Sequence, residues 1–269
     1  MLQVLLPEAE AIGVEVVVVG DVTPGERSPS PAVRIVHAPV ADMLALHRWG
    51  IAEARGDVVA IGEDHAVPEA GWCEAVIRAH AEHRGAGAVA GCLVNATNAT
   101  LAGRANFLAF AAPWQPPMPE LPSGRPPPAS ALTFKRRALE EIASQPPGWL
   151  EAELIPSLFV RGSIVADDRV VVHHHQDHGS LWSIRNAFHS ARSSYGFKRG
   201  RLAPAERRML ARWTIANVPR RLRAEAREGA GAASGRAESA LIGAIAFAAG
   251  LGAAVGALTG PGRSPDRVA

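Results

Sequence analysis

The sequence has little cysteine. Only Cys73 and Cys92 occur among its 269 residues, and no Cys-x-x-Cys spacing is present. Because disulfide frameworks belong mainly to secreted proteins, we expect two reduced thiols in a cytosolic setting and no disulfide. The amino end lacks a basic stretch followed by an apolar core and a small-residue cleavage site, so we expect no secretory signal.

Several short catalytic motifs are also missing. The chain has no Gly-x-Ser-x-Gly elbow, no Walker phosphate loop and no zinc-type spacing of Cys and His. These absences argue against the hydrolases, P-loop nucleotidases and zinc fingers that depend on such motifs. The glycine-rich run at 85–91 lacks the dinucleotide spacing and leads from a predicted helix into a predicted strand, so we interpret it as a turn.

Charge is nearly balanced overall but unevenly distributed. The formal net charge is +2, and 48% of the residues are hydrophobic, which predicts one main domain with an appendage. Basic residues concentrate between Arg185 and Arg227, which suits the anionic headgroups of a membrane surface. Helices packed on the main domain with basic outer faces are the alternative. No nucleic-acid module accompanies these charges, so we expect no nucleic-acid partner.

An uncharged segment lies near the carboxyl end. Residues 240–260 have about the length of a membrane-spanning helix, but they are mostly Ala and Gly, which favour lipid only weakly. Gly252, Gly256 and Gly260 recur every four residues, a spacing that allows close helix packing in a membrane or in a soluble pair. We therefore divide the chain into a main domain at 1–178, a basic helical region at 179–236 and an apolar segment with a short tail at 237–269.

Apolar runs that suit buried strands alternate with helical patterns in the main domain. The strands are predicted at 14–19, 33–36, 58–61 and 88–94, and the helices at 41–55 and 74–83. After a proline-rich loop at 113–128, a strand is predicted at 131–134 and a helix at 149–159. This alternation indicates an α/β fold with a doubly wound, mostly parallel sheet flanked by helices.

Polar side chains follow the predicted strands, and they are the candidate site residues. Glu63, Asp64 and His65 come directly after the strand at 58–61, where an open α/β sheet places a metal, a nucleotide or both. A capped turn with Asp64 as a hydrogen-bonding residue is the alternative. The apolar run at 170–172 leads into three histidines at 173–175, and Glu151 lies off the apolar face of its predicted helix.

The ordered segments VEVVVVGD, ARGDVVAIGEDHAVPEAGW, ALTFKRRAL, WLEAELIPSLFVRG and VVVHHH carry a resemblance that covers roughly 14–175. Together they resemble the nucleotide-sugar-dependent glycosyltransferases of family 2, which have the GT-A fold. The resemblance implies that Glu63, Asp64 and His65 match the family's Asp-x-Asp motif, which holds Mg²⁺ or Mn²⁺ on the donor diphosphate. The last position is His instead of the usual Asp. The family's first strand has no counterpart here, so we expect a truncated amino end.

The resemblance also implies roles for residues outside that motif. Glu151 matches the catalytic base of an inverting mechanism, with Glu153 as a competitor, although the family more often has Asp there. His173, or else His175, would complete the metal site. Asp21 would contact the base or ribose of the donor, or else serve as an ordinary loop residue.

Two functions follow as hypotheses. The first is a metal-dependent inverting hexosyltransferase that moves a sugar from a nucleotide-sugar donor to a glycan or lipid-linked acceptor, at the cytoplasmic face of the cell membrane or in the cytoplasm. The second is a catalytically impaired, membrane-associated binding module of the same fold.

Overall fold

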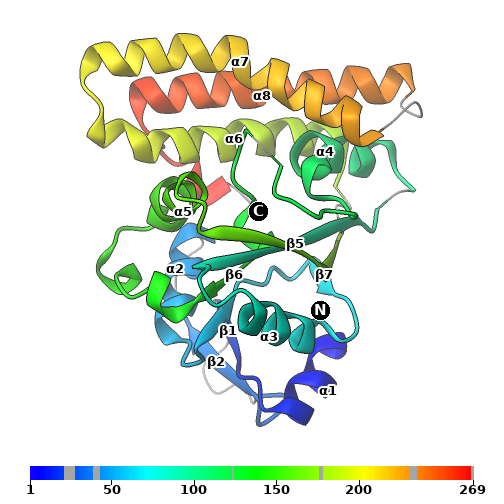
Figure 1. Ribbon diagram of the computed structural model, residues 1–269. Coiled ribbons are helices and arrows are strands. Elements are labelled where there is room, and N and C mark those ends of the chain that lie inside the picture. Colours follow the sequence, from blue (N-terminus) through cyan, green and yellow to red (C-terminus); the bar gives the residue numbers. More distant parts are fainter. Residues whose placement is uncertain are drawn as a thin grey trace. The chain divides into compact units, whose positions relative to one another are not determined.

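The chain folds into two compact units in a computed structural model that describes residues 1–20, 28–38, 43–97, 99–122, 124–175, 178–230 and 235–267 (Figure 1). Unit 1 comprises Met1–Val94 and Pro116–His174, and unit 2 comprises Asn95–Gln115 and His175–Ala269. The predicted boundary at 178 lies close to the passage from unit 1 to unit 2. The segment at 95–115, which we predicted as part of the main domain, belongs to unit 2.

Unit 1 is built on a five-stranded sheet with the order β3-β6-β5-β7-β4. Its strands are β3 (Val58–Ala60), β4 (Ala66–Pro68), β5 (Ala88–Asn95), β6 (Leu132–Lys135) and β7 (Ile164–His174). The pairs β3–β6, β5–β6 and β4–β7 are all antiparallel. Helices and strands are both present, so the α/β class is confirmed. The prediction of a mostly parallel sheet is wrong, because these three pairs are antiparallel.

Two central strands approach each other closely because one of them carries a glycine. A Cβ atom at Gly91 of β5 would overlap the carbonyl oxygen of Val170 on β7. Val89 and Val170 are also buried in one cluster with Val76 and Ala79 of α3 (Trp72–Glu82), which covers this part of the sheet. Burial of apolar side chains on both sheet and helix stabilises this layer.

A second, two-stranded sheet lies in the amino-terminal part of unit 1. Strand β1 (Val16–Gly20) is parallel to β2 (Val33–His37), with Val16 opposite Val33. These two valines are buried with Ala9 of α1 (Leu2–Ile12). Helix α2 (Met43–Glu53) follows. The helical and strand patterns predicted here are confirmed in type, while residues 41 and 42, where we expected the helix at 41–55 to begin, lie outside the described part of the chain.

The predicted helix at 149–159 is a π-helical turn followed by an α-helix. The π turn spans Leu150–Leu154 and α5 spans Ile155–Val160, and the backbone N–H of Ile155 donates to the carbonyl of Leu150. Pro156 lacks an N–H, so the ordinary hydrogen-bond pattern cannot run through this position. The wider turn places Glu151 and Glu153 at the start of the helix.

Unit 2 consists of helices, namely α4 (Leu101–Ala111), α6 (Ser180–Lys198), α7 (Pro204–Ala230) and α8 (Arg236–Thr259), with short 3₁₀ turns (Figure 1). Helices α6 and α8 pack backbone to backbone at two of the predicted glycines. A Cβ atom at Gly252 or Gly256 would overlap the carbonyl oxygen of Phe188 or Arg192, respectively. Gly260 instead ends α8 with a positive φ of 89°.

Helix α8 has the length and hydropathy that a membrane-crossing helix needs, with a mean hydropathy of 2.1 over its most apolar window. Within unit 2, however, 67% of that window is buried. Ile242, Ile245 and Ala249 share a cluster with residues of α4, α6 and α7. A core helix of a bundle has the same properties, so they do not by themselves assign a membrane span.

Candidate functional site

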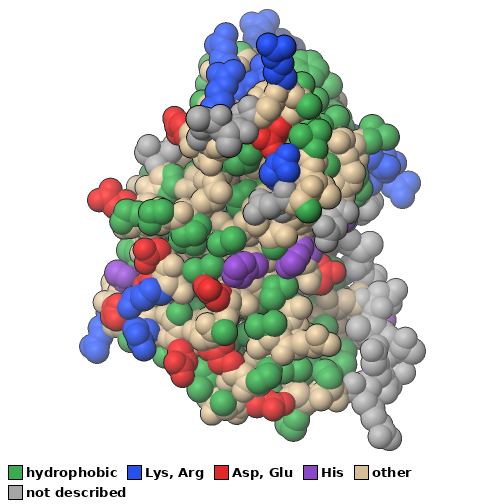
Figure 2. Space-filling model, turned by 90° about the vertical axis from the view of Figure 1, so that its right-hand side faces the viewer, with side chains coloured by type: hydrophobic (Ala, Val, Ile, Leu, Met, Phe, Trp, Pro, Cys, Tyr) green, Lys and Arg blue, Asp and Glu red, His purple; other side chains and the backbone are tan. Residues whose placement is uncertain are grey.

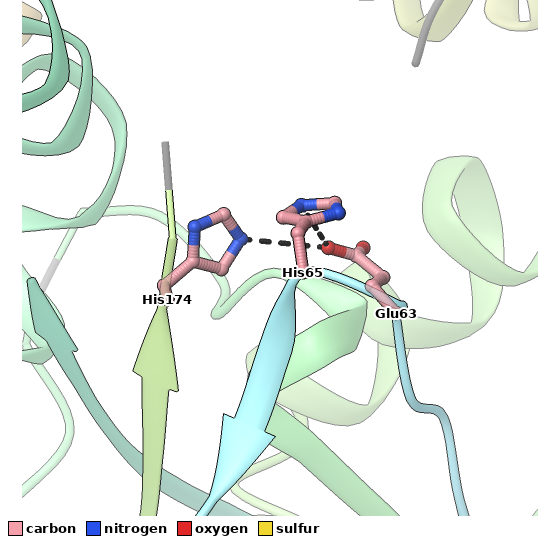
Figure 3. Close-up of side chains that lie close together, drawn as sticks. All are labelled: Glu63, His65 and His174. Atoms are coloured by element: carbon pink, nitrogen blue, oxygen red, sulfur yellow. Dashed lines mark ion pairs between the residues drawn. The ribbon is translucent and has the colours of Figure 1, made fainter. Parts of the chain in front are cut away.

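Three side chains of unit 1 meet where β4 begins and β7 ends (Figure 3). Glu63 lies in the turn after β3, and its carbonyl oxygen accepts a hydrogen bond from the N–H of Ala66 at 3.0 Å. His65 is the residue directly before β4, which begins at Ala66. His174 is the last residue of β7 and pairs with Ala66 in the antiparallel register. Strand pairing thus brings a carboxylate and two imidazoles together from positions more than a hundred residues apart.

The three groups are close enough to bind one metal ion. Glu63 Oε2 lies 3.1 Å from His65 Nε2 and 3.4 Å from His174 Nε2. The two imidazole rings are nearly perpendicular, with centroids 4.7 Å apart. Ligands bound at about 2.0–2.2 Å and separated by angles of about 90–110° lie roughly 3.0–3.5 Å from each other. The two distances from Glu63 therefore fit a common divalent ion, and all three ligand atoms lie within 4.8 Å of one another.

Hydrogen bonding dominates the electrostatics of this cluster. Burial acts to raise the pKa of Glu63, but the hydrogen bonds from His174 and His65 outweigh burial and hold that pKa well below its usual range. The hydrogen bond to Glu63, helped by a second one to Asp64, raises the pKa of His65 to about 9 against the opposing effect of burial. Glu63 is therefore a carboxylate, and His65 is an imidazolium at neutral pH as long as no ion replaces its proton.

Asp64 takes a different position from the ligand we predicted. Its side chain is fully exposed, and its Oδ1 lies 2.9 Å from His65 Nδ1. A carboxylate on the far nitrogen of a histidine fixes the ring and leaves the other nitrogen facing the site. Asp64 therefore orients His65, and Glu63 supplies the carboxylate of the cluster.

The histidine that joins the cluster is His174, and the prediction of His173 differs from the structure by one position. Successive side chains of a strand point to opposite faces. His174 shares the face of the buried Val170 and Val172, whereas His173 is opposite Val67 on the other face. His175, the second candidate, follows the end of β7 and is the first residue of unit 2 after the sheet.

Glu151 forms a separate pair with a histidine that sequence reasoning missed. His47 Nδ1, from α2, lies 2.9 Å from Glu151 Oε1, and both side chains are largely buried. Glu151 Oε2 is buried and has no hydrogen-bond partner among the described residues. Glu153 lies in the same π turn and is half-buried. No pattern near His47 indicated this role, because the ring reaches Glu151 only through tertiary packing.

A second group of acids and histidine in unit 1 does not have the properties of a metal site. Glu82, His83 and Asp167 place ligand atoms close together, but Arg169 lies 2.5 Å from Glu82 and 2.6 Å from Asp167. The hydrogen bonds of Arg169 lower the pKa of both carboxyl groups. The guanidinium therefore supplies the positive charge that an ion would bring.

Comparison with protein-family models gives no match, and comparison with curated protein sequences gives none either. The predicted donor residue Asp21 lies outside the described residues.

The geometry of the described residues defines the candidate site. It consists of the cluster of Glu63, His65 and His174, hereafter the Glu-His-His cluster, and of the Glu151–His47 pair.

Proposed function

We propose that this protein is a metal-dependent inverting glycosyltransferase that moves a sugar from a nucleotide-sugar donor to a glycan or lipid-linked acceptor at the cytoplasmic face of the cell membrane. The Glu-His-His cluster is the observation that carries the proposal. Two of its members, Glu63 and His65, lie in the segment that resembles the family's metal motif, and the ligand atoms of all three residues lie within 4.8 Å of one another.

The chemistry of the cluster favours Mn²⁺ over Mg²⁺. Imidazole nitrogens suit transition metals, whereas Mg²⁺ is bound mostly through carboxylate, water and phosphate oxygens. The cluster offers two nitrogens and one carboxylate oxygen. When bound, a divalent ion would neutralise the negative charge that develops on a departing nucleotide diphosphate. Asp64 would keep His65 Nε2 directed at the ion through its contact with Nδ1.

Glu151 is the residue we assign to accept the proton of the acceptor hydroxyl. The contact with His47 occupies Oε1 and leaves Oε2 buried without a hydrogen-bond partner in the described structure. An unpaired carboxylate oxygen can take a proton from a hydroxyl that enters its site, and such a proton transfer typically contributes a factor of about 10²–10⁴ to rate. His47 would hold the carboxylate in place while the hydroxyl attacks the anomeric carbon.

Calorimetry with Mn²⁺ and a panel of nucleotide sugars tests the proposal. We expect a metal-dependent heat for at least one donor, and we expect Glu63→Gln to remove it together with sugar transfer. Glu82→Gln is the matched control, because Glu82 also lies in an acid–histidine group but faces Arg169. Asp64→Asn should weaken metal binding by only about 10- to 100-fold, as for other groups that orient a ligand. Unchanged metal binding by Glu63→Gln would contradict the assignment.

The alternative is a catalytically impaired binding module of GT-A-like fold, associated with a membrane. One observation favours it: Glu63 and His65 neutralise each other, so the cluster is satisfied without an ion. This alternative predicts no metal-dependent heat with any nucleotide sugar. The same calorimetric panel therefore separates the two functions.

A further inference from the structure

Unit 2 contains a cavity of about 510 Å³ between the end of α7 and the start of α8. Arg223 and Arg227 line it from α7, and Ser239 and Phe247 line it from α8. Figure 2 shows this end of the helices at the top of the view, where Lys and Arg side chains stand beside hydrophobic ones. The cavity lies wholly within unit 2, and nothing in the proposed transfer reaction uses it.

Two positively charged side chains line the cavity. Arg223 donates from Nη2 to the carbonyl oxygen of Gly243 at 3.3 Å, which holds its guanidinium against α8. Arg227 lies one helical turn further along α7 and is exposed. Three acidic side chains lie in the same stretches, and none of them lines the cavity: Glu225 pairs with Arg221 at 3.7 Å, Glu238 pairs with Arg104 at 2.8 Å, and Glu228 lies outside the lining. Two guanidinium groups therefore line the cavity without an acidic side chain beside them in its wall.

Exposed apolar side chains extend away from the cavity along the same two helices. Phe247, Leu251 and Leu258 are 58%, 43% and 46% exposed, and their spacing of four and seven residues places them on one face of α8. Met209 and Trp213, 68% and 47% exposed, lie on successive turns of α7. Exposed large apolar side chains that alternate with basic ones along a helix are typical of a surface that rests on lipid.

We propose that this cavity, hereafter the arginine cavity, binds the phosphate headgroup of an anionic phospholipid while the exposed apolar side chains enter the outer part of the bilayer. Arginine pairs bind phosphate through parallel N–H donors, and the apolar side chains have no role in holding a soluble anion. The combination therefore selects a lipid at a membrane surface over free phosphate. The proposal is independent of the proposed transferase activity.

Binding of the full chain to vesicles tests this proposal. We expect binding to phosphatidylcholine vesicles that contain phosphatidylglycerol and little binding to phosphatidylcholine alone. The double variant Arg223→Gln/Arg227→Gln should bind the mixed vesicles about thirtyfold more weakly, which corresponds to ~1 kcal/mol for each arginine near the surface. Phe247→Ser should weaken binding about tenfold through loss of apolar contact.

Matched variants distinguish binding at the arginine cavity from general electrostatic attraction of the protein to the vesicle surface. Arg161→Gln/Arg185→Gln removes the same charge from exposed positions, after α5 and on α6, that do not line the cavity. It should weaken binding less than threefold at physiological salt, where charges beyond about 8 Å are screened. Arg227→Gln alone breaks no hydrogen bond identified among the described residues, so it tests the proposal even if the double variant does not fold. It should weaken vesicle binding about fivefold.

Several results would overturn the proposal. One is equal loss of binding in the control double variant, and another is no loss in Arg227→Gln. Competition by inorganic phosphate at the concentration of the lipid phosphate would indicate a soluble-anion site instead. Binding of an oligonucleotide, lost in the cavity variants without any vesicle binding, would indicate nucleic acid as the partner.

Discussion

The packing of α8 against α6 leads to a prediction that distinguishes a core helix from a lipid-facing one. Substitution Gly252→Ala adds one methyl group where the backbones of the two helices meet. That Cβ atom would lie 2.9 Å from the carbonyl carbon of Phe188 and closer still to its oxygen. Nonbonded carbon atoms prefer about 3.5–4.0 Å, so the helices must separate by at least roughly half an ångström.

The size of the effect follows from two opposing contributions. Ala favours a helix over Gly by about 1 kcal/mol. Overpacking of a rigid core costs about 1–3 kcal/mol or more, and here the obstacle is backbone of α6 and not the end of a side chain. We therefore expect Gly252→Ala to lower the free energy of unfolding by about 1–2 kcal/mol, which shifts the melting temperature by roughly 2–8 °C.

Gly243→Ala on the same helix is the control. The atoms nearest to its Cβ atom would all belong to the guanidinium of Arg223, with Nη2 at 3.1 Å, and that flexible side chain can move away. We expect this variant to be neutral or up to about 1 kcal/mol more stable. Thermal unfolding followed by circular dichroism measures both variants. If Gly252→Ala stabilises the protein as much as Gly243→Ala does, α8 does not pack on α6 as described.

Two further predictions concern unit 1. Burial and the nearby charge of Lys135 lower the pKa of His80 to about 4. Below about pH 6.5 the unfolded chain therefore takes up a proton on this histidine, whereas the folded chain does so only near pH 4. Stability should therefore fall by up to about 3 kcal/mol between pH 6.5 and 4 in denaturant titrations, and an equally steep fall in His80→Gln would rule out this histidine as the cause. Under the proposed function, His47→Gln should reduce sugar transfer by about tenfold or more without changing Mn²⁺ affinity, because it disturbs the position of Glu151 and not the Glu-His-His cluster. Parallel loss of both would show a general structural defect.

Most strands and helices of unit 1 could be predicted from the sequence, although β4 was missed, but their arrangement could not. The apolar run at 58–61 corresponds to β3, and the run at 88–94 corresponds to β5. The prediction of parallel strands assumed that each helix between two strands crosses back over the sheet. Helix α4, between β5 and β6, belongs to unit 2, and β5 and β6 are antiparallel.

Part of the candidate site was also predictable. Glu63 and His65 follow an apolar run, and this position in the sequence is enough to indicate a group of ligands. We predicted His173, or else His175, and the place of His174 was not predictable, because the apolar residues that precede the three histidines leave open which face each one takes. His47 could not be found at all, since 104 residues separate it from Glu151 and only folding brings them together.

The geometry of the Glu-His-His cluster depends on the packing of the central strands. His174 lies opposite Ala66, so the register of β4 on β7 sets the position of its ring beside His65. A shift of that register by one residue would bring the other face of β7 forward and replace His174 by a neighbour. Four residues earlier, Val170 lies on the same face of β7 and fits against Gly91 of β5. The close approach that this glycine allows thus fixes β7 at a point two side chains along the same face from His174. Under the proposed function, the metal affinity of the cluster should therefore depend on a backbone contact that contains no ligand.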